Sequence, residues 1–410
     1  MRPDSVRDEP LNGGSENLVG VVLVVLKKRI SVTLMAGATI ASMAIVSISG
    51  TASASGSKAV NWANVQQLSA SGPTSMAALV RAAKKEGKLN TIALPANWAN
   101  YGAILKAFQS KYGIKVNSEN PNGSSQDELN AIIADKGRTT NPDVIDVGTN
   151  FAVTATKQGL LAPYRVATWK NIPAALKNPK GYWFDDYGGF VAIGCNTATV
   201  KKCPTSFAQM LKPGMGYKIG INDNPTASSS ALAAVMAAAV AHGGSLNNVK
   251  PGVDFFQKLN KEKNFVATIA GPSTVQSGAT NIVIWWDYLQ ASGLRSLPGF
   301  SKKWKVVIPS DVRMAEYYTQ AINKSGPDPA AARLFEEFLY STQGQNLWLA
   351  GEARPVELPF LQAHHLANPK SLAALPPVPH GTLLYPTQAQ ITAAESVVMK
   401  YWATEVTSGP

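Results

Sequence analysis

The segment 281–289, which reads Asn-Ile-Val-Ile-Trp-Trp-Asp-Tyr-Leu, constrains the fold more than any other part of the chain. Its first half is short, apolar and β-branched, which is typical of a strand buried on both faces of a parallel sheet. Open α/β sheets bind ligands just outside the carboxyl ends of such strands. The indoles, carboxylate and phenol that end the segment therefore lie where a ligand would bind. The alternative is a Trp-rich core strand that ends in a structural Asp.

Strand, loop and helix alternate along much of the chain, which predicts an α/β protein with two lobes, each a doubly wound, mostly parallel sheet. We predict strands at 89–94, 115–117, 143–148, 190–195, 218–221, 281–286, 305–308 and 317–323. We predict helices at 75–86, 101–112, 126–136, 206–211, 228–242, 330–340 and 343–351. The Ala-rich helix 228–242 is almost wholly apolar but too short to span a membrane, so we expect it in a core.

The N-terminal part of the sequence has the pattern of an export signal. Basic residues 27–29 precede the apolar stretch 30–49, and the small residues 52–54 resemble a cleavage site. An uncleaved membrane anchor is the alternative, because the apolar stretch is almost long enough to span a bilayer. The pattern predicts a protein that is periplasmic or lies at the extracellular face of the cytoplasmic membrane.

The strand–helix pattern restarts after Gly188-Gly189, which we expect to be one crossing between the lobes, with the other at 313–316. The predicted divisions are the N-terminal extension and signal peptide 1–54, a flexible leader 55–74, the first part of lobe I 75–188, lobe II 189–312, the return to lobe I 313–345, and helices and loops that pack across the lobes 346–410.

The sequence contains two cysteines, Cys195 and Cys203. In an exported protein, a pair this close in sequence predicts a disulfide that closes a short loop. A redox or nucleophilic role would need a neighbour that lowers a thiol pKa, and Lys201 and Lys202 are the candidates. Export makes the disulfide the preferred interpretation.

No motif for catalysis, metal binding or cofactor binding is found in the sequence. None of the four histidines stands near a cysteine or an acidic cluster at metal-ligand spacing, and nucleophile-elbow, phosphate-loop and dinucleotide-binding patterns are missing. We therefore expect no metal, no cofactor and no enzymatic activity, with an exported hydrolase or transferase as the alternative of another class.

The net charge of +12 favours loose contact with anionic polymers, and a wall-contact protein is a third possibility. The Lys and Arg residues do not form a stripe with interleaved aromatic residues, which argues against nucleic acid as a partner.

Loops at the ends of the predicted strands would converge on a cleft between the lobes. The candidate ligand-binding residues are Asn97, Trp98, Asn100, Ser124, Ser125, Thr149, Asn150, Thr226, Ser228, Ser229, Trp285, Asp287, Tyr288 and Tyr317. Side chains alternate along a strand, so at most one of Tyr317 and Tyr318 should face the ligand.

These residue types suit a small molecule that carries an ammonium group. Asp287 would pair with the cation, and Trp98 and Trp285 would stack on it. The helix start at 226–229 would take an anionic end of the ligand, since free backbone N–H groups favour negative charge there. For each Ser or Thr, simple helix capping is the alternative.

Short motifs in a fixed order and spacing carry a family resemblance over residues 76–356. They are Lys85-Glu86-Gly87-Lys88-Leu89, Asp146 with Gln158-Gly159-Leu160-Leu161 and Pro163-Tyr164, Gly194-Cys195-Asn196-Thr197, Pro204-Thr205-Ser206-Phe207, Ala321-Ile322-Asn323-Lys324 with Pro327, Ala330-Ala331-Ala332 and Phe335, Thr342-Gln343-Gly344-Gln345, and Arg354-Pro355-Val356. In these motifs the chain resembles the bacterial extracellular solute-binding proteins of ABC import systems. It is most similar to the branch that includes polyamine, ferric-iron and phosphonate binders.

The resemblance implies a two-lobed, type II periplasmic-binding-protein fold whose lobes close around a solute. It also implies a monomer that hands its solute to a membrane permease and the associated ATPase. Ferric-iron binders carry a Tyr-Tyr pair on the lobe-II segment, whereas this chain reads Trp285-Trp286-Asp287-Tyr288 there, which argues against iron. A small polar, amine-containing solute is the expected ligand. A ferric-iron, phosphonate or thiamine-type binder of the same fold is the alternative.

Overall fold

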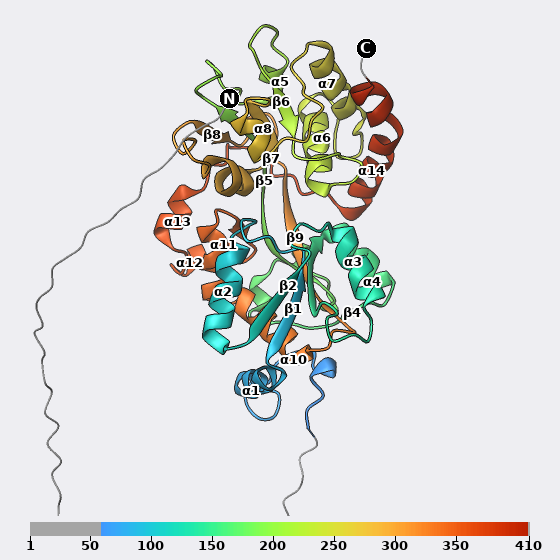
Figure 1. Ribbon diagram of the computed structural model, residues 1–410, viewed down its shortest axis with the longest axis vertical. Coiled ribbons are helices and arrows are strands. Elements are labelled where there is room, and N and C mark those ends of the chain that lie inside the picture. The colour runs from blue at the N-terminus through green and yellow to red at the C-terminus, as the bar shows by residue number, and fades with distance from the viewer. Residues whose placement is uncertain (1–58, 409–410) are drawn as a thin grey trace, which may run out of the picture. The chain divides into compact units, whose positions relative to one another are not determined.

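The computed structural model describes residues 59–408, which form two lobes joined by long strands (Figure 1). The strands are β1 (Lys88–Ile92), β2 (Lys115–Glu119), β3 (Val144–Gly148), β4 (Leu161–Ala162), β5 (Phe184–Asn196), β6 (Ile219–Ile221), β7 (Ile282–Trp286), β8 (Trp304–Val307), β9 (Ala315–Asn323) and β10 (Arg354–Pro355). The helices are α1 (Met76–Glu86), α2 (Tyr101–Tyr112), α3 (Ser125–Ala134), α4 (Thr149–Lys157), α5 (Phe207–Met210), α6 (Ser229–Ala241), α7 (Lys250–Lys261), α8 (Pro272–Gln276), α9 (Asp287–Leu289), α10 (Pro329–Leu339), α11 (Thr342–Ala350), α12 (Leu358–Ala363), α13 (Pro369–Ala374) and α14 (Gln388–Trp402). The predicted signal peptide lies outside the described residues.

Most strands belong to one eight-stranded sheet that continues from the first lobe into the second, with the path β3–β9–β5–β7–β6. β4 pairs with β9, and β8 and β10 pair with β5. The pairs β1–β2 and β6–β7 are parallel, as expected for doubly wound lobes. The long strands β5 and β9 run antiparallel to each other and to their remaining partners. The sheet is therefore mixed, because two strands cross between the lobes in opposite directions.

The crossing between the lobes depends on two adjacent glycines of β5. Gly188 lies opposite Tyr317 of β9, and Gly189 lies opposite Glu316. A side chain at Gly188 would collide with the backbone of Glu316, and one at Gly189 would collide with the Asp287 carboxylate. These positions therefore allow β5 to pass close to both neighbours. The two crossings that the sequence predicts lie opposite each other in one ladder.

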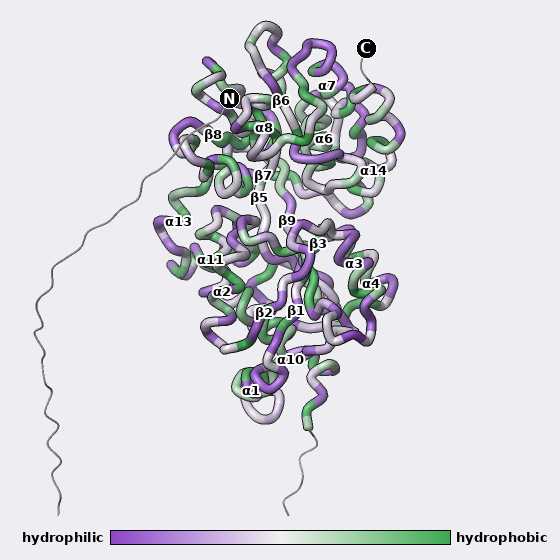
Figure 2. The backbone as a smooth tube through the Cα atoms, viewed as in Figure 1, coloured by the Kyte–Doolittle hydropathy of each residue, from purple (hydrophilic) through white to green (hydrophobic). Residues whose placement is uncertain are grey.

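Local sequence signals account for the helices that frame the lobes. In α1 the hydroxyl of Ser75 accepts a hydrogen bond from the Ala78 N–H at the start, and Gly87 ends the helix with a positive φ of 78°. In α6 every residue from Ala231 to Ala239 is buried, and hydrophobic residues recur along this helix in Figure 2. The expected core helix is confirmed.

All of the predicted strands and helices occur, with ends displaced by a few residues. β5 is longer than the predicted strand 190–195 and begins at Phe184, because the glycines at the crossing continue the ladder. The helices α4, α7, α8 and α9 and the two-residue strands β4 and β10 are not among the predicted elements.

The C-terminal helix α14 contacts both lobes (Figure 1). It packs against α6 and α7 of the second lobe and against α4 of the first. Its Glu395 accepts a hydrogen bond of 3.2 Å from the Asn150 side chain of α4. In the segment that follows α14, Glu405 forms an ion pair of 2.8 Å with Lys250 of α7. The end of the chain is thus tied to both lobes.

The disulfide between Cys195 and Cys203 is present, which confirms the sequence prediction. Cys195 is buried near the end of β5, and the bond closes a short loop after that strand. Because the loop is short, the disulfide restricts the unfolded chain only locally. It does not connect distant parts of the fold.

Replacing both cysteines by alanine is expected to lower the free energy of unfolding by about 2–3 kcal/mol, since the closed loop is short. Urea denaturation of the variant and of the oxidised protein would measure the difference. The reduced wild-type protein is the matched control and should behave like the variant. Equal midpoints for the oxidised protein and the variant would contradict this expectation.

Candidate functional site

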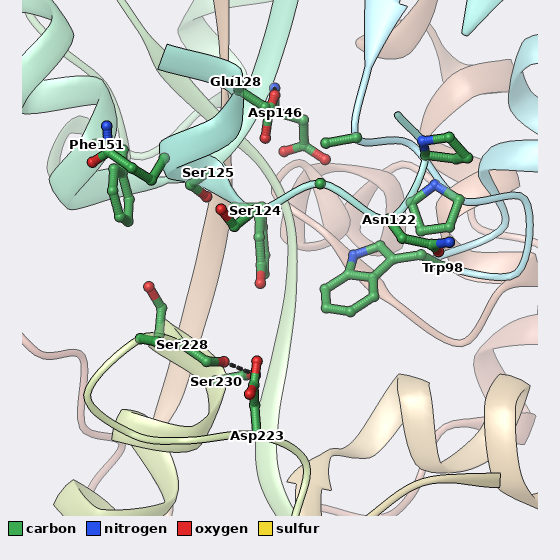
Figure 3. A pocket seen from close by; sticks show the side chains of 18 of the residues that line it. Trp98, Asn122, Ser124, Ser125, Glu128, Asp146, Phe151, Asp223, Ser228 and Ser230 are labelled. Carbon is green, nitrogen blue, oxygen red and sulfur yellow. Dashed lines mark hydrogen bonds between the residues drawn. The ribbon is translucent and has the colours of Figure 1, made fainter. Parts of the chain in front are cut away.

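A cavity of about 290 Å³ lies between the lobes, and we call it the cleft (Figure 3). The first lobe lines it with the loop after β1, the loop before α3 and the start of that helix, and residues inside β3, α4 and β9. The second lobe lines it with the loop after β6 and the start of α6. Its lining residues are Ala93, Pro95, Trp98, Pro121, Asn122, Gly123, Ser124, Ser125, Gln126, Glu128, Asp146, Phe151, Asn222, Asp223, Ala227, Ser228, Ser229, Ser230 and Tyr318.

Two helices begin at the cleft, one from each lobe. Ser124 caps α3 by accepting a hydrogen bond from the Asp127 N–H, and the hydroxyl of Ser125 accepts one from Gly148. Ser228 precedes α6 without capping it, and its hydroxyl is instead 3.1 Å from that of Ser230. The first N–H groups of a helix have no partner within the helix, so both starts favour a negatively charged or hydrogen-bond-accepting group.

Three carboxyl side chains also line the cleft: Asp146, Glu128 and Asp223. Asp146 accepts hydrogen bonds from the hydroxyls of Tyr101 (2.5 Å) and Tyr187 (3.0 Å), and burial raises its pKa to about 7. Burial also raises the pKa of Glu128, whose carboxylate accepts the Asp146 N–H at 2.9 Å. No Lys, Arg or His is found among the described residues that line this cavity.

Three aromatic residues, Phe151, Tyr318 and Trp98, complete the lining. The Trp98 indole donates a 2.7 Å hydrogen bond to the Tyr187 hydroxyl, which in turn donates to Asp146. Its ring meets Tyr318 edge to face, with the centroids 5.6 Å apart. The network fixes the indole next to the carboxyl group, an arrangement that suits a cationic group.

A scan against protein-family models matches residues 139–379 to the bacterial extracellular solute-binding proteins, which is more than half of the chain. The chain belongs to this family. It is therefore a solute-binding component of an ABC transporter and not an enzyme, as the sequence resemblance implies. No curated protein matches the sequence significantly.

Solved structures show the same fold at low sequence identity. The periplasmic binding protein AfuA from Actinobacillus pleuropneumoniae, with fructose-6-phosphate bound, is 20% identical, with a TM-score of 0.60 over 78% of this chain and 99% of its own. The Atu4243-GABA receptor is 17% identical, with a TM-score of 0.58 over 77% and 96%. Iron-bound HitA from Pseudomonas aeruginosa is 19% identical, with a TM-score of 0.55 over 76% and 97%. These likenesses confirm the predicted two-lobed type II fold.

In residues 59–408 of this solute-binding protein, no helix is both long and apolar enough to cross a membrane. The family to which it belongs is extracellular.

The cleft brings together some of the residues that the sequence analysis singles out, and others lie elsewhere. Trp98, Ser124, Ser125, Ser228 and Ser229 line it. The following candidates do not line it: Asn97, Asn100, Thr149, Asn150, Thr226, Trp285, Asp287, Tyr288 and Tyr317.

The structure gives most of the candidates outside the cleft lining another partner or place. Asn97 is exposed, Asn100 donates to the Leu347 carbonyl, and the Thr226 hydroxyl donates to the Asn224 side chain. Thr149, Asn150 and Tyr317 line a second cavity. Trp285 and Tyr288 pack edge to face against Trp98, with centroids 6.3 and 6.4 Å away. Their ligand roles stay predictions.

Asp287 is fully buried and forms an ion pair with Arg354 of β10. It also accepts a 3.0 Å hydrogen bond from the Phe190 N–H of β5. These contacts fit the alternative interpretation, a structural Asp at the end of a core strand. The cation that pairs with Asp287 is the Arg354 side chain, whereas we expected the ammonium group of a ligand.

The cleft also contains residues that our candidate set lacks, and the carboxyl groups Asp146, Glu128 and Asp223 and the ring of Tyr318 are the important ones. Asp146 lies inside a predicted strand, and Asp223 is the second residue after one. Its position just after a strand therefore indicates Asp223 as a candidate cleft residue. Nothing in the local sequence indicates that the Glu128 side chain points from α3 into the cleft.

Several buried carboxyl groups outside the cleft lining give an expected pH dependence of stability. Burial raises the pKa of Asp143 to about 7, of Asp185 to about 8 and of Glu357 to about 7, against about 4 in an unfolded chain. Between these values the folded protein binds more protons than the unfolded one. We therefore expect stability to be greatest in mild acid and to fall as the pH rises from about 5 to 8, by at most about 1.4 kcal/mol per pH unit for each group.

Melting temperatures measured from pH 5 to pH 9 test this expectation. Asp185→Asn is the useful comparison, because it should make the melting temperature fall less steeply with rising pH. Asp185 does not line the cleft, so the variant leaves the cleft unchanged. A melting temperature that rises steadily toward pH 9 would contradict it.

Proposed function

We propose that this solute-binding protein captures a small zwitterionic amine in the cleft and hands it to its permease. The ammonium group of the solute would lie among the carboxyl groups Asp223, Asp146 and Glu128. The anionic group would lie at the starts of α3 and α6. This keeps the amine-containing solute that the sequence predicts, with Asp223 in the role first assigned to Asp287.

The observation that carries the proposal is the charge of the cleft lining, with three carboxyl groups and no basic side chain among the described residues. A cation in such a cavity gains charge-assisted hydrogen bonds, whereas a solute with only negative charge meets unfavourable electrostatics. Asp223 is the most available of the three. One of its oxygens accepts the Asn224 N–H at 2.7 Å, and the other has no hydrogen-bond partner among residues 59–408.

The aromatic rings support the same end of the solute. Trp98 and Tyr318 present ring surface beside Asp146, which suits an ammonium group through cation–π attraction. For the anionic group of the solute, the hydroxyls of Ser125, Ser228 and Ser229 and the two helix starts supply donors. The cavity volume of about 290 Å³ suits a small molecule.

The alternatives of the same fold receive less support from the cleft. Iron bound by adjacent tyrosines would need a second phenol, and Tyr318 is the one tyrosine that lines the described cleft. Within residues 59–408, no group of three or more His, Cys, Asp and Glu residues is placed to hold a metal ion. A phosphonate dianion would lie beside carboxyl groups without a Lys or Arg to balance it.

A thermal-shift series with four-carbon solutes of different charge tests the proposal on the full chain. The set is 4-aminobutyrate, butylammonium, butyrate and butanol, with putrescine, ethylphosphonate and ferric citrate for the alternatives. A solute at a hundred times its dissociation constant adds about 2.7 kcal/mol of stability, which is easily detected as a shift of the melting temperature.

We expect the zwitterion to raise the melting temperature more than its cationic and neutral analogues, and the anion to give no shift. The Atu4243-GABA receptor, a structure of similar fold, is named for a zwitterion of this kind, which makes 4-aminobutyrate a reasonable first probe. A larger shift with the phosphonate or with ferric citrate than with every amine would overturn the proposal.

A further inference from the structure

A second cavity of about 550 Å³ lies where the crossing strands, α4, α6 and the C-terminal segment meet, and we call it the hinge cavity. It shares a single lining residue with the cleft, Ser229 at the start of α6. Ser229 closely approaches the first lobe, since a Cβ atom added to Gly148 would lie 3.3 Å from its hydroxyl. That approach separates the two cavities.

The walls of the hinge cavity are largely apolar and come from both lobes. The first lobe contributes Trp183 of the segment before β5, and the second contributes Leu232 of α6. Ile391 of α14 closes a third side. Tyr317 of β9 and Tyr385 lie nearly parallel, with their ring centroids 6.4 Å apart. A cavity of this size, mainly apolar with a few polar groups, has the properties of a small-molecule site.

One carboxyl group, that of Asp185, lies on the face of the sheet that carries Tyr317, because its β9 partner is Thr319. One oxygen of Asp185 accepts a 2.7 Å hydrogen bond from Thr319, and its other oxygen has no partner among the described residues. Glu316 also borders the cavity, but side chains alternate along β9, so its carboxyl group lies on the opposite face, with Tyr318. No Lys, Arg or His is found in the described lining.

The surroundings of Asp185 disfavour its charged form. Burial raises the pKa of Asp185 to about 8. A cation placed beside this carboxyl group would remove the penalty, and the nearly parallel rings of Tyr317 and Tyr385 would offer the cation π faces.

We propose that the hinge cavity is a second binding site, which takes one apolar organic cation such as an aryl- or alkylammonium ion. The site is independent of the solute site in the cleft, and it does not depend on the identity of the transported solute. Its occupant contacts both lobes and the crossing strand β9, so its binding shifts the equilibrium between open and closed lobes.

Titration calorimetry of the full chain with 2-phenylethylammonium tests the proposal, with 2-phenylethanol and phenylacetate as neutral and anionic analogues of the same size. The cation should bind with one site per chain, the neutral analogue more weakly, and the anion not at all. Asp185→Asn, which keeps the size of the side chain, should weaken binding of the cation roughly ten- to hundredfold, through loss of one charge-assisted interaction.

Three further variants locate the site and guard against a folding defect. Ile391→Trp fills the cavity and should abolish binding, whereas Met399→Trp adds the same bulk on an exposed part of α14 and should not. Asp223→Asn in the cleft should leave the affinity for 2-phenylethylammonium unchanged.

Binding that is lost in Asp223→Asn but kept in Asp185→Asn and Ile391→Trp would overturn the second site, while it would support the proposed function of the cleft. Absence of binding by the wild-type protein at millimolar concentrations would also overturn it. Loss of binding in Ile391→Trp, with retention in Met399→Trp and Asp223→Asn, would support it even if Asp185→Asn fails to fold.

Discussion

Replacing Arg354 by methionine is expected to lower the free energy of unfolding by about 3–5 kcal/mol, which is the cost of leaving a buried charge without its partner. Asp287 is fully buried, and Arg354 is its ion-pair partner. The guanidinium group also donates to the Pro376 carbonyl and lies 4.9 Å from the ring centroid of Phe190. The ion pair therefore connects the end of β7, β5 and the C-terminal segment. Its loss should destabilise the second lobe as a whole.

Urea denaturation of the variant would measure this effect, and two comparisons make it specific. The double variant Arg354→Met, Asp287→Asn removes both charges and should recover part of the lost stability. Lys250→Met disrupts half-exposed ion pairs with Asp254 and Glu405 and should cost no more than about 1 kcal/mol. If Arg354→Met were as mild as Lys250→Met, the structural role of Asp287 would be refuted.

Replacing Asp223 by asparagine is expected to weaken binding of the zwitterionic solute roughly ten- to hundredfold, by removing one charge-assisted hydrogen bond to the ammonium group. The change keeps the size and the hydrogen-bonding ability of the side chain. Because Asp223 is part of the surface of the cleft and not of a core, the melting temperature of the solute-free protein should hardly change.

Titration calorimetry with the solute that the thermal-shift series identifies would measure the dissociation constant. Asp254→Asn, an Asp of α7 outside the described cleft lining, is the matched control and should bind like the wild-type protein. An unchanged dissociation constant in Asp223→Asn would exclude this carboxylate from the solute site. A loss of affinity for the neutral analogue as large as that for the zwitterion would indicate a general distortion of the cleft.

The fold could be predicted well from the sequence because its signals are local. Apolar runs such as 281–286 and 143–148 mark strands, and Ser75 and Gly87 mark the ends of a helix. The antiparallel pairing of β5 and β9 could not be predicted in this way, because it depends on contacts between segments more than a hundred residues apart, such as Gly188 with Tyr317.

The site was harder to predict because it depends on which side chains face the cleft and which find partners elsewhere. Asp287 ends a strand, as a ligand residue should, but its cation comes from Arg354, 67 residues further along the chain. Strand alternation is informative for the tyrosines of β9. Tyr318 faces the cleft and Tyr317 faces the hinge cavity, so the two adjacent phenols serve different cavities.

Hydrogen–deuterium exchange of the full chain, with and without the solute that gives the largest thermal shift, is the most direct test of a solute site between the lobes. We expect the solute to slow exchange at residues 124–128 and 228–232, which form the two helix starts of the cleft. Slower exchange confined to residues 315–317 and 385–391, which border the hinge cavity, would show that the solute does not bind in the cleft.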